Sequence, residues 1–179
     1  MVRWTGVYQC LMLWPENLAM MFNSFFNDKA FPPATSRAIR HSVYRWLLLS
    51  YILVLRDMSI AVKKQFPTYE HFVKAQLLTE AEVYLFENAN IEPDYCRYWI
   101  PLLWISQTVK KYYVPQHLKG KVKRKSIMKH THMGIFMKEM IRLRGNLGDL
   151  LCYDWIPIPL AIVQVTKRAN RGFVFNKPN

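Results

Sequence analysis

Apolar side chains recur at helical spacing along most of the chain. From Pro15 onward they follow one another at intervals of three and four residues, which is the period of one helix face. The members of this first face are Leu18, Met21, Phe22, Phe25 and Phe26. A proline in the first turn of a helix costs no intrahelical hydrogen bond, so the pattern predicts a helix from Pro15 to about residue 27.

A second and longer apolar pattern begins after the proline pair at positions 32 and 33. Thr35 or Ser36 can cap a helix that continues to about Lys64, and the Phe-Pro pair at positions 66 and 67 ends it. The apolar positions that keep the helical period are Ile39, Val43, Trp46, Leu47, Leu53, Val54 and Ile60. We therefore expect one continuous helix of amphipathic character.

The rest of the chain predicts further helices, over residues 68–77, 79–87, 99–113 and 126–144. Thr79 and Glu82 have the spacing of a capping box, which marks the start of one of them. Gly145 and Gly148 are expected to break the last helix. Because no strand-like alternation or internal repeat stands out, the predicted fold class is all-α, a bundle of long amphipathic helices.

Two apolar runs have the character of membrane segments but not the length. They are WLLLSYILVL (46–55) and IPIPLAIVQV (156–165). Crossing a bilayer takes about 20 mostly apolar residues, so neither run can cross one alone. The second run turns polar at residues 166–168.

The residues around the start of the second run fit the entry of a membrane helix. These candidate entry residues are Asp154, Trp155, Pro157 and Pro159. Both prolines would fall in the first turn, where the backbone amides have no intrahelical acceptor. An indole at position 155 would then lie at the boundary between water and lipid, where amphipathic rings are favoured.

The charge of the chain is strongly positive. Twenty-five Lys and Arg residues against 12 Asp and Glu residues give a formal net charge of +13. This balance favours an anionic partner, which is nucleic acid, phospholipid headgroups or small anions. The basic segment KGKVKRK (119–125) is a weak signal for nucleic acid, because no helix-turn-helix, aromatic RNA platform or zinc finger accompanies it. A nucleic-acid-binding module is thus the least favoured alternative, and no nucleic acid is expected.

The residues with reactive or metal-binding side chains form no recognisable constellation. Cys10, Cys96 and Cys152 are widely spaced, which indicates neither a disulfide framework nor a zinc ribbon. His130 and His132 have no cysteine or carboxylate at ligand spacing beside them. We expect no metal site, no catalytic residues and no enzymatic activity.

The long predicted helix carries three aligned cations. At about 100° per residue, Arg45, Arg56 and Lys63 fall within a few tens of degrees of one another. Such an edge faces either water, an acidic partner or an ion-filled cavity. A solvated face, a wall that attracts anions and a nucleic-acid contact are all compatible with this pattern.

Several ordered motifs resemble the bestrophin family. RLRGNLGDLLCYDWIPIPLAIVQV (142–165) is similar to the entry of the family's third membrane segment. Arg3-Trp4, followed by Trp14-Pro15, resembles its Arg-Trp and Pro-Trp-Pro-Asp segment, with one apparent extra residue between them. YILVLRDMSIAVKKQFP (51–67) is similar to a further family stretch that ends in Phe-Pro. The resemblance covers residues 2–165.

The resemblance implies a function. Bestrophins are pentameric, calcium-activated anion channels of the plasma membrane, so it implies a chloride channel subunit with membrane lipid and further subunits as partners. In that architecture, the bundle corresponds to the cytosolic region, and Arg45, Arg56 and Lys63 would line the anion pathway. Chloride would be the transported ion. The alternative is a non-conducting protein that co-assembles with full-length subunits, as homo- or hetero-oligomers.

The resemblance also divides the chain. Residues 1–165 are interpreted as a partial bestrophin-like helical region, and residues 166–179 as an unrelated polar tail. The family's hydrophobic neck and calcium site are expected to lie outside these residues, so we expect the chain to be non-conducting alone. The second constriction of the pore would fall in the aperture region between Ile127 and Thr131.

Overall fold

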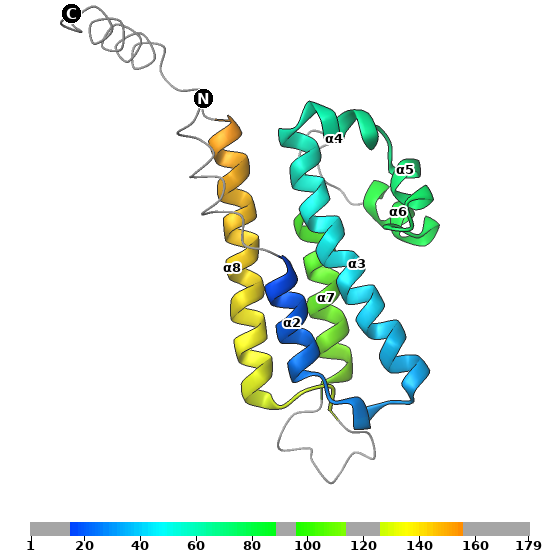
Figure 1. Cartoon of the computed structure of the whole chain (residues 1–179), viewed down its shortest axis with the longest axis vertical. Coiled ribbons are helices and arrows are strands. Elements are labelled where there is room, and N and C mark those ends of the chain that lie inside the picture. The colour runs from blue at the N-terminus through cyan, green and yellow to red at the C-terminus, as the bar shows by residue number, and fades with distance from the viewer. Residues whose placement is uncertain (1–14, 89–95, 114–125, 156–179) are drawn as a thin grey trace, which may run out of the picture.

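The computed structural model describes residues 15–88, 96–113 and 126–155, and the regular structure within these ranges is helical. The elements are α2 (Pro15–Phe25), η1 (Asp28–Ala30), α3 (Pro33–Met58), α4 (Ile60–Gln65), α5 (Tyr69–Lys74), α6 (Glu80–Glu87), α7 (Trp99–Tyr112) and α8 (His130–Trp155). Helices α2, α3, α7 and α8 lie side by side as a bundle, α4 follows the end of α3, and α5 and α6 lie to one side of α3 (Figure 1). The predicted all-α bundle is confirmed.

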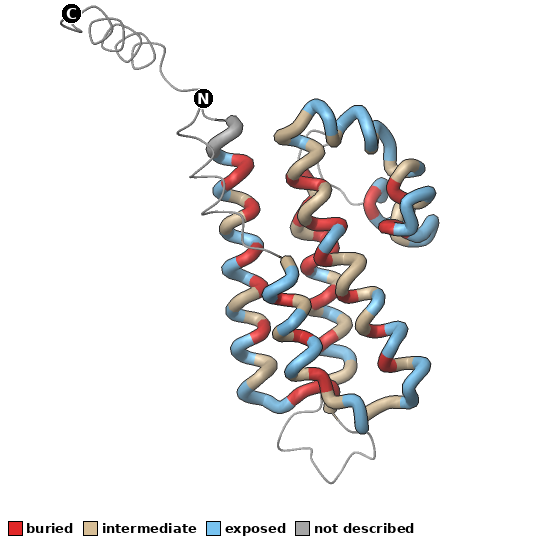
Figure 2. The backbone as a smooth tube through the Cα atoms, in the orientation of Figure 1, coloured by how far each residue is buried: buried red, intermediate tan, exposed pale blue. Residues whose placement is uncertain are grey.

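The bundle is held together by apolar faces that turn inward (Figure 2). Phe22 of α2 is fully buried, and its ring lies 5.5 Å from Phe136 of α8 and 6.5 Å, edge to face, from Tyr44 of α3. Edge-to-face and tilted ring pairs at such distances add to the stabilisation that burial itself provides. The helical spacing of the first apolar pattern thus places one phenylalanine between two partner helices.

A second aromatic cluster joins the short helices to the bundle. Phe86 of α6 is fully buried against Trp104 of α7, with ring centroids 5.2 Å apart, and Tyr69 of α5 lies 5.6 Å from Phe86 on the same cluster. Trp104 in turn meets Trp46 of α3 edge to face at 5.9 Å. The small α4 to α6 unit is therefore anchored on α3 and α7 through aromatic side chains.

The long helix predicted to continue to Lys64 is interrupted. Helix α3 ends at Met58, Ser59 has extended backbone angles of φ −120° and ψ 118°, and α4 begins at Ile60. Serine has a low helix propensity and is common at the residue before a helix, although the Ser59 side chain makes no capping hydrogen bond here. The Ser59 amide still donates to the carbonyl of Leu55, and its carbonyl accepts from Lys63, so both backbone groups stay bonded across the break.

The glycines expected to end the last helix do not break it, and that prediction was wrong. Helix α8 continues through Gly145 and Gly148 to Trp155. A glycine costs a helix only about 1 kcal/mol. The buried leucines on the same stretch outweigh this cost; they are Leu143, Leu147, Leu150 and Leu151.

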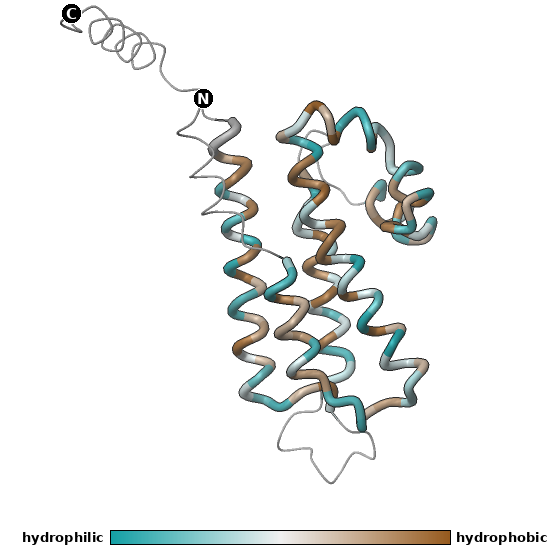
Figure 3. The backbone as a smooth tube through the Cα atoms, in the orientation of Figure 1, coloured by the Kyte–Doolittle hydropathy of each residue, from teal (hydrophilic) through white to brown (hydrophobic). Residues whose placement is uncertain are grey.

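The apolar run 46–55 belongs to the core of the bundle. Leu47, Leu49, Leu53 and Val54 of α3 are all buried. Figure 3 shows the hydrophobic stretch along this helix in brown. Among the described helices, none combines the length and apolar character that a membrane crossing requires. Of the candidate entry residues, Asp154 and Trp155 are the last two residues of α8, while Pro157 and Pro159 lie outside the described residues.

Candidate anion pathway

The three aligned cations lie on two different helices. Arg45 and Arg56 belong to α3, whereas Lys63 lies on α4, beyond the break at Ser59. The angular relation calculated from 100° per residue therefore holds within α3 only. Lys63 is exposed, whereas the two arginines are only partly exposed.

Arg45 is held by a carboxylate rather than left open to solvent. Its guanidinium donates two hydrogen bonds to Glu82 of α6, from Nη1 to Oε2 at 2.8 Å and from Nη2 to Oε1 at 2.7 Å. Both side chains are nearly buried, with exposed fractions of 13% and 12%. Such a forked pair is a strong and directional contact, and it ties α6 to the middle of α3.

Glu82 has further partners. The predicted capping box is present, because the Thr79 amide donates to Glu82 Oε2 at 2.8 Å and the Glu82 amide donates to Thr79 Oγ1. The Trp46 indole also donates to Glu82 Oε1, at 2.7 Å. Burial alone would raise the pKa of Glu82, but the hydrogen bonds from Thr79, Trp46 and Arg45 together lower it below the ordinary value. The carboxylate is therefore charged at neutral pH, and it offsets the field of Arg45.

Arg56 supports the end of α3 and the start of α5. Its Nη2 donates to the carbonyl of Pro67 at 2.6 Å. Its guanidinium also lies over the rings of Tyr69 and Phe72, at 5.8 and 5.9 Å from their centroids. These contacts leave the positive charge uncompensated by a carboxylate within the salt-bridge network of the described residues. Arg56 thus combines a structural role with a cation that can still act on anions.

The two ends of the aperture region differ in exposure. Ile127 is fully buried, its amide donates to the Tyr112 carbonyl at 3.1 Å, and its carbonyl accepts from the Asn27 amide at 2.8 Å. Thr131 is exposed in the first turn of α8. Ile127 therefore fastens the segment before α8 to the ends of α2 and α7. Its assignment to a pore constriction stays a prediction.

The histidines of α8 make contacts with aromatic residues. His132 stacks on Phe25 with ring centroids 4.2 Å apart, and His130 Nδ1 lies 2.6 Å from the hydroxyl of Tyr113. Cys96 is buried and its thiol donates to the Leu53 carbonyl, whereas Cys152 is exposed. Burial, and next the carboxylate of Asp57, raise the pKa of the Cys96 thiol. This cysteine is a poor nucleophile at neutral pH.

Sequence reasoning missed the carboxylate partners of the arginines. Glu82 was noted only as a capping residue, yet it binds Arg45 from 37 positions away. Asp28 likewise binds Arg40 at 2.5 Å. The available signal was a carboxylate in the first turn of η1 and of α6, but only the tertiary packing shows which arginine each one meets.

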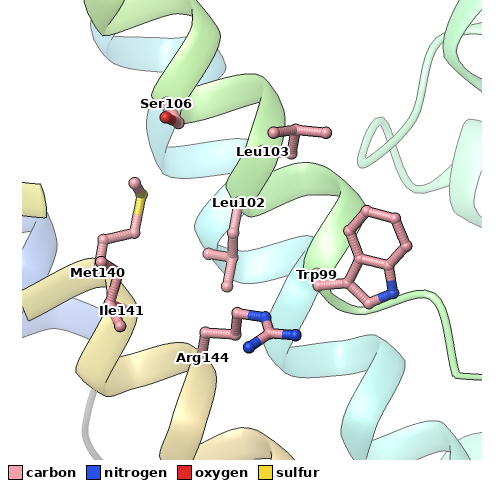
Figure 4. A pocket seen from close by; sticks show the side chains of 7 residues that line it. All are labelled: Trp99, Leu102, Leu103, Ser106, Met140, Ile141 and Arg144. Carbon is pink, nitrogen blue, oxygen red and sulfur yellow. The ribbon is translucent and has the colours of Figure 1, made fainter.

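The sequence patterns also did not predict a groove between α7 and α8. It encloses about 210 Å³ and is lined mainly by apolar side chains, with Arg144 pointing toward Trp99 at one end (Figure 4). The lining residues are Trp99, Leu102, Leu103, Ser106, Met140, Ile141 and Arg144. Leu103 and Ile141 are 44% and 68% exposed, which is unusual for side chains of this size.

Comparisons with known proteins give one consistent result. The family model described as "Bestrophin, RFP-TM, chloride channel" matches residues 1–177. The chain is 32% identical to human bestrophin-2a over 163 residues and 30% identical to human bestrophin-1 over 171 residues, which cover 91% and 96% of this chain. It is 29% identical over 173 residues, 97% of the chain, to bestrophin homolog 14 of Caenorhabditis elegans.

These relatives are longer than this chain. The matched residues span 29% of bestrophin-2a, 27% of bestrophin-1 and 38% of homolog 14. The family model also includes residues 166–177, which the sequence patterns set apart as a polar tail. The division of the chain at residue 165 stays a prediction.

Proposed function

The chain belongs to the bestrophin family, and from this premise we propose that it forms part of the wall of a chloride channel in the plasma membrane. The observation that carries the proposal is the match of the chloride-channel family model to residues 1–177. The positive net charge supports it, because a basic wall raises the local concentration of anions. Electrostatic attraction without tight binding also satisfies the requirement that each ion must leave again.

Lys63 is the most informative of the three predicted pathway residues. It is exposed, whereas Arg45 is neutralised by Glu82 and Arg56 supports Pro67. Its replacement therefore changes the charge of the wall with little effect on packing. A change at either arginine would mix an electrostatic effect with a structural one.

Single-channel recording of a full-length bestrophin that carries these residues tests the proposal. Lys63→Glu should lower the chloride conductance about two- to fivefold at low ionic strength and less at high ionic strength, because salt screens the added charge. Lys63→Gln should give a smaller decrease. Lys138→Glu makes the same charge change at an exposed position on α8 and is the matched control. A conductance that Lys63→Glu leaves unchanged at low salt removes Lys63 from the pathway.

A second candidate function is co-assembly with full-length subunits without conduction. The exposed apolar residues Leu103 and Ile141 favour it, since they line a groove that another subunit could cover. Co-purification of this chain with a tagged full-length bestrophin would support this function. A monodisperse monomer that does not associate would contradict it.

A further inference from the structure

A small cavity lies at the N-terminal end of α3, next to η1. It encloses about 230 Å³ and is lined by Asp28, Phe31, Pro33, Ser36, Arg37 and Arg40. Polar and charged side chains thus meet here at the start of a long helix. None of the predicted pathway residues lines this cavity.

Two buried donor atoms at this cavity have no hydrogen-bond partner among the described residues. The hydroxyl of Ser36 makes no hydrogen bond within the described residues, although the residue is only 5% exposed. The Nε atom of Arg40 is likewise buried and unpartnered there. An unsatisfied buried polar group costs about 1–3 kcal/mol, so a ligand that accepts hydrogen bonds from both atoms would gain stabilisation here.

The helix end adds further positive potential. The residue before α3 is Pro32, which provides no side-chain cap, and the first turn contains no acidic residue. Pro33 has no amide hydrogen and the Ser36 amide donates to the Pro32 carbonyl, so the helix contributes the positive end of its dipole at this cavity rather than free amides. Arg37 is exposed and has no ion pair within the described part of the chain.

Asp28 is the carboxylate that lines the cavity, and it offsets only part of the positive charge there. Asp28 accepts from Arg40 Nη2 at 2.5 Å, but its side chain is 66% exposed, whereas that of Arg40 is 26% exposed. The Arg40 guanidinium is also fixed over the ring of Phe26, with 4.7 Å between them. One oriented arginine and one free arginine therefore face the same space.

We propose that this cavity binds a phosphate group. A guanidinium offers parallel donors that match the oxygens of a phosphate, and the Ser36 hydroxyl can donate to a further oxygen. Two guanidinium groups and a hydroxyl together present several donors, which suit an anion with several oxygens better than a single-atom anion. The phosphate can come from a soluble phosphate compound or from a lipid headgroup.

Binding to the purified full-length protein tests the proposal, with pyrophosphate in solution as one arm. The other arm uses phosphatidylcholine vesicles with and without phosphatidic acid. Pyrophosphate binding indicates a soluble ligand, and binding to the acidic vesicles alone indicates a headgroup. Absence of binding in both arms overturns the proposal.

Substitutions at the cavity separate binding from folding. Ser36→Ala should weaken phosphate binding about five- to tenfold while leaving the melting temperature of the free protein equal or higher, because the hydroxyl has no partner to lose. Arg37→Gln should weaken binding by a similar factor. Asp28→Asn should strengthen binding, since it removes a competing carboxylate from Arg40.

Lys138→Gln is the charge-matched control, because Lys138 is exposed on α8 and does not line the cavity. It should leave the affinity for pyrophosphate or vesicles unchanged. If Ser36→Ala, Arg37→Gln and Lys138→Gln all bind as tightly as the unchanged protein, the cavity is not the site. If Lys138→Gln weakens binding as much as Arg37→Gln, the interaction is non-specific charge attraction and the proposal is wrong.

Discussion

Tyr98 packs so closely on α8 that it restricts the residue at position 148. Its hydroxyl donates to the carbonyl of Arg144 at 3.3 Å, and a Cβ atom added to Gly148 would lie 2.9 Å from the same oxygen. At Gly145, one turn earlier, no atom lies within 4 Å of an added Cβ. Contact with Tyr98 therefore restricts position 148, whereas no such contact restricts position 145. Burial also raises the pKa of the Tyr98 phenol, which keeps it a hydrogen-bond donor.

These two glycines predict opposite effects of the same substitution. Gly148→Ala should lower the free energy of unfolding by about 1 kcal/mol, since the clash with Tyr98 exceeds the gain in helix propensity. Gly145→Ala should raise it by up to about 1 kcal/mol, because only the propensity gain applies there. Urea unfolding of both variants measures the difference. Combining Gly148→Ala with Tyr98→Phe should remove the penalty, and a penalty that persists would contradict the proposed clash.

Glu82 connects three hydrogen-bond donors in a site that is nearly closed to water. Glu82→Gln keeps the shape of the side chain but removes its charge, so we expect a loss of about 2 kcal/mol at pH 7. The pKa of Glu82 in the folded protein lies below its ordinary value of 4.5. Its contribution is therefore complete above pH 4.5 and is lost as the pH falls through the lowered folded pKa.

The pH dependence of the free energy of unfolding tests this prediction. Urea unfolding at a series of pH values should show that the unchanged protein and Glu82→Gln converge in stability below pH 4.5. Glu87→Gln, at an exposed position on the same helix, should have an effect within about 0.5 kcal/mol at every pH. If the difference in free energy of unfolding between the unchanged protein and Glu82→Gln stays constant down to low pH, the charge of Glu82 does not stabilise the fold.

At the scale of elements, the sequence predicted most helices but not where two of them end. Apolar spacing located α2, α6 and α7 to within a few residues, and the capping box marked the start of α6. The break at Ser59 could not be predicted, because the apolar pattern continues past it to Ile60, which is 76% exposed. The length of α8 could not be predicted either. The low helix propensity of Gly145 and Gly148 indicated a break, but the burial of the neighbouring leucines outweighs it.

The contacts of Arg56 lead us to predict that the α4 to α5 segment can loosen independently of the bundle. Arg56→Gln removes the hydrogen bond to the Pro67 carbonyl and the contacts with two aromatic rings. Amide hydrogen exchange in residues 60–74 should then accelerate about tenfold, while exchange in α7 and α8 stays unchanged. Arg142→Gln, at an exposed position on α8, is the control. Equal acceleration in α7 would show that Arg56 stabilises the whole fold instead.

At the scale of the whole molecule, the sequence led to the family but not to the site. Ordered motifs were sufficient for the family because they depend only on residue identity and spacing. The environment of each cation depends on which elements pack against it. Glu82 neutralises Arg45 from 37 residues away, and the cavity beside Ser36 and Arg40 of α3 is completed by Asp28 of η1 and by Phe31. Neither of these contributions from another part of the chain has a periodic signature in the sequence.

The apolar groove between α7 and α8 predicts where subunits meet. Ile141 is 68% exposed and lies beside Leu103 and Met140 in this groove, whereas Ile60 is 76% exposed but does not line it. In a full-length bestrophin, Ile141→Glu should therefore weaken assembly at least tenfold, because the charge would have to be buried against the neighbouring subunit. Ile60→Glu, the same change at another exposed position, should leave assembly intact. Size-exclusion chromatography with light scattering across a dilution series measures both. Equal assembly of the two variants would exclude the groove as a contact between subunits.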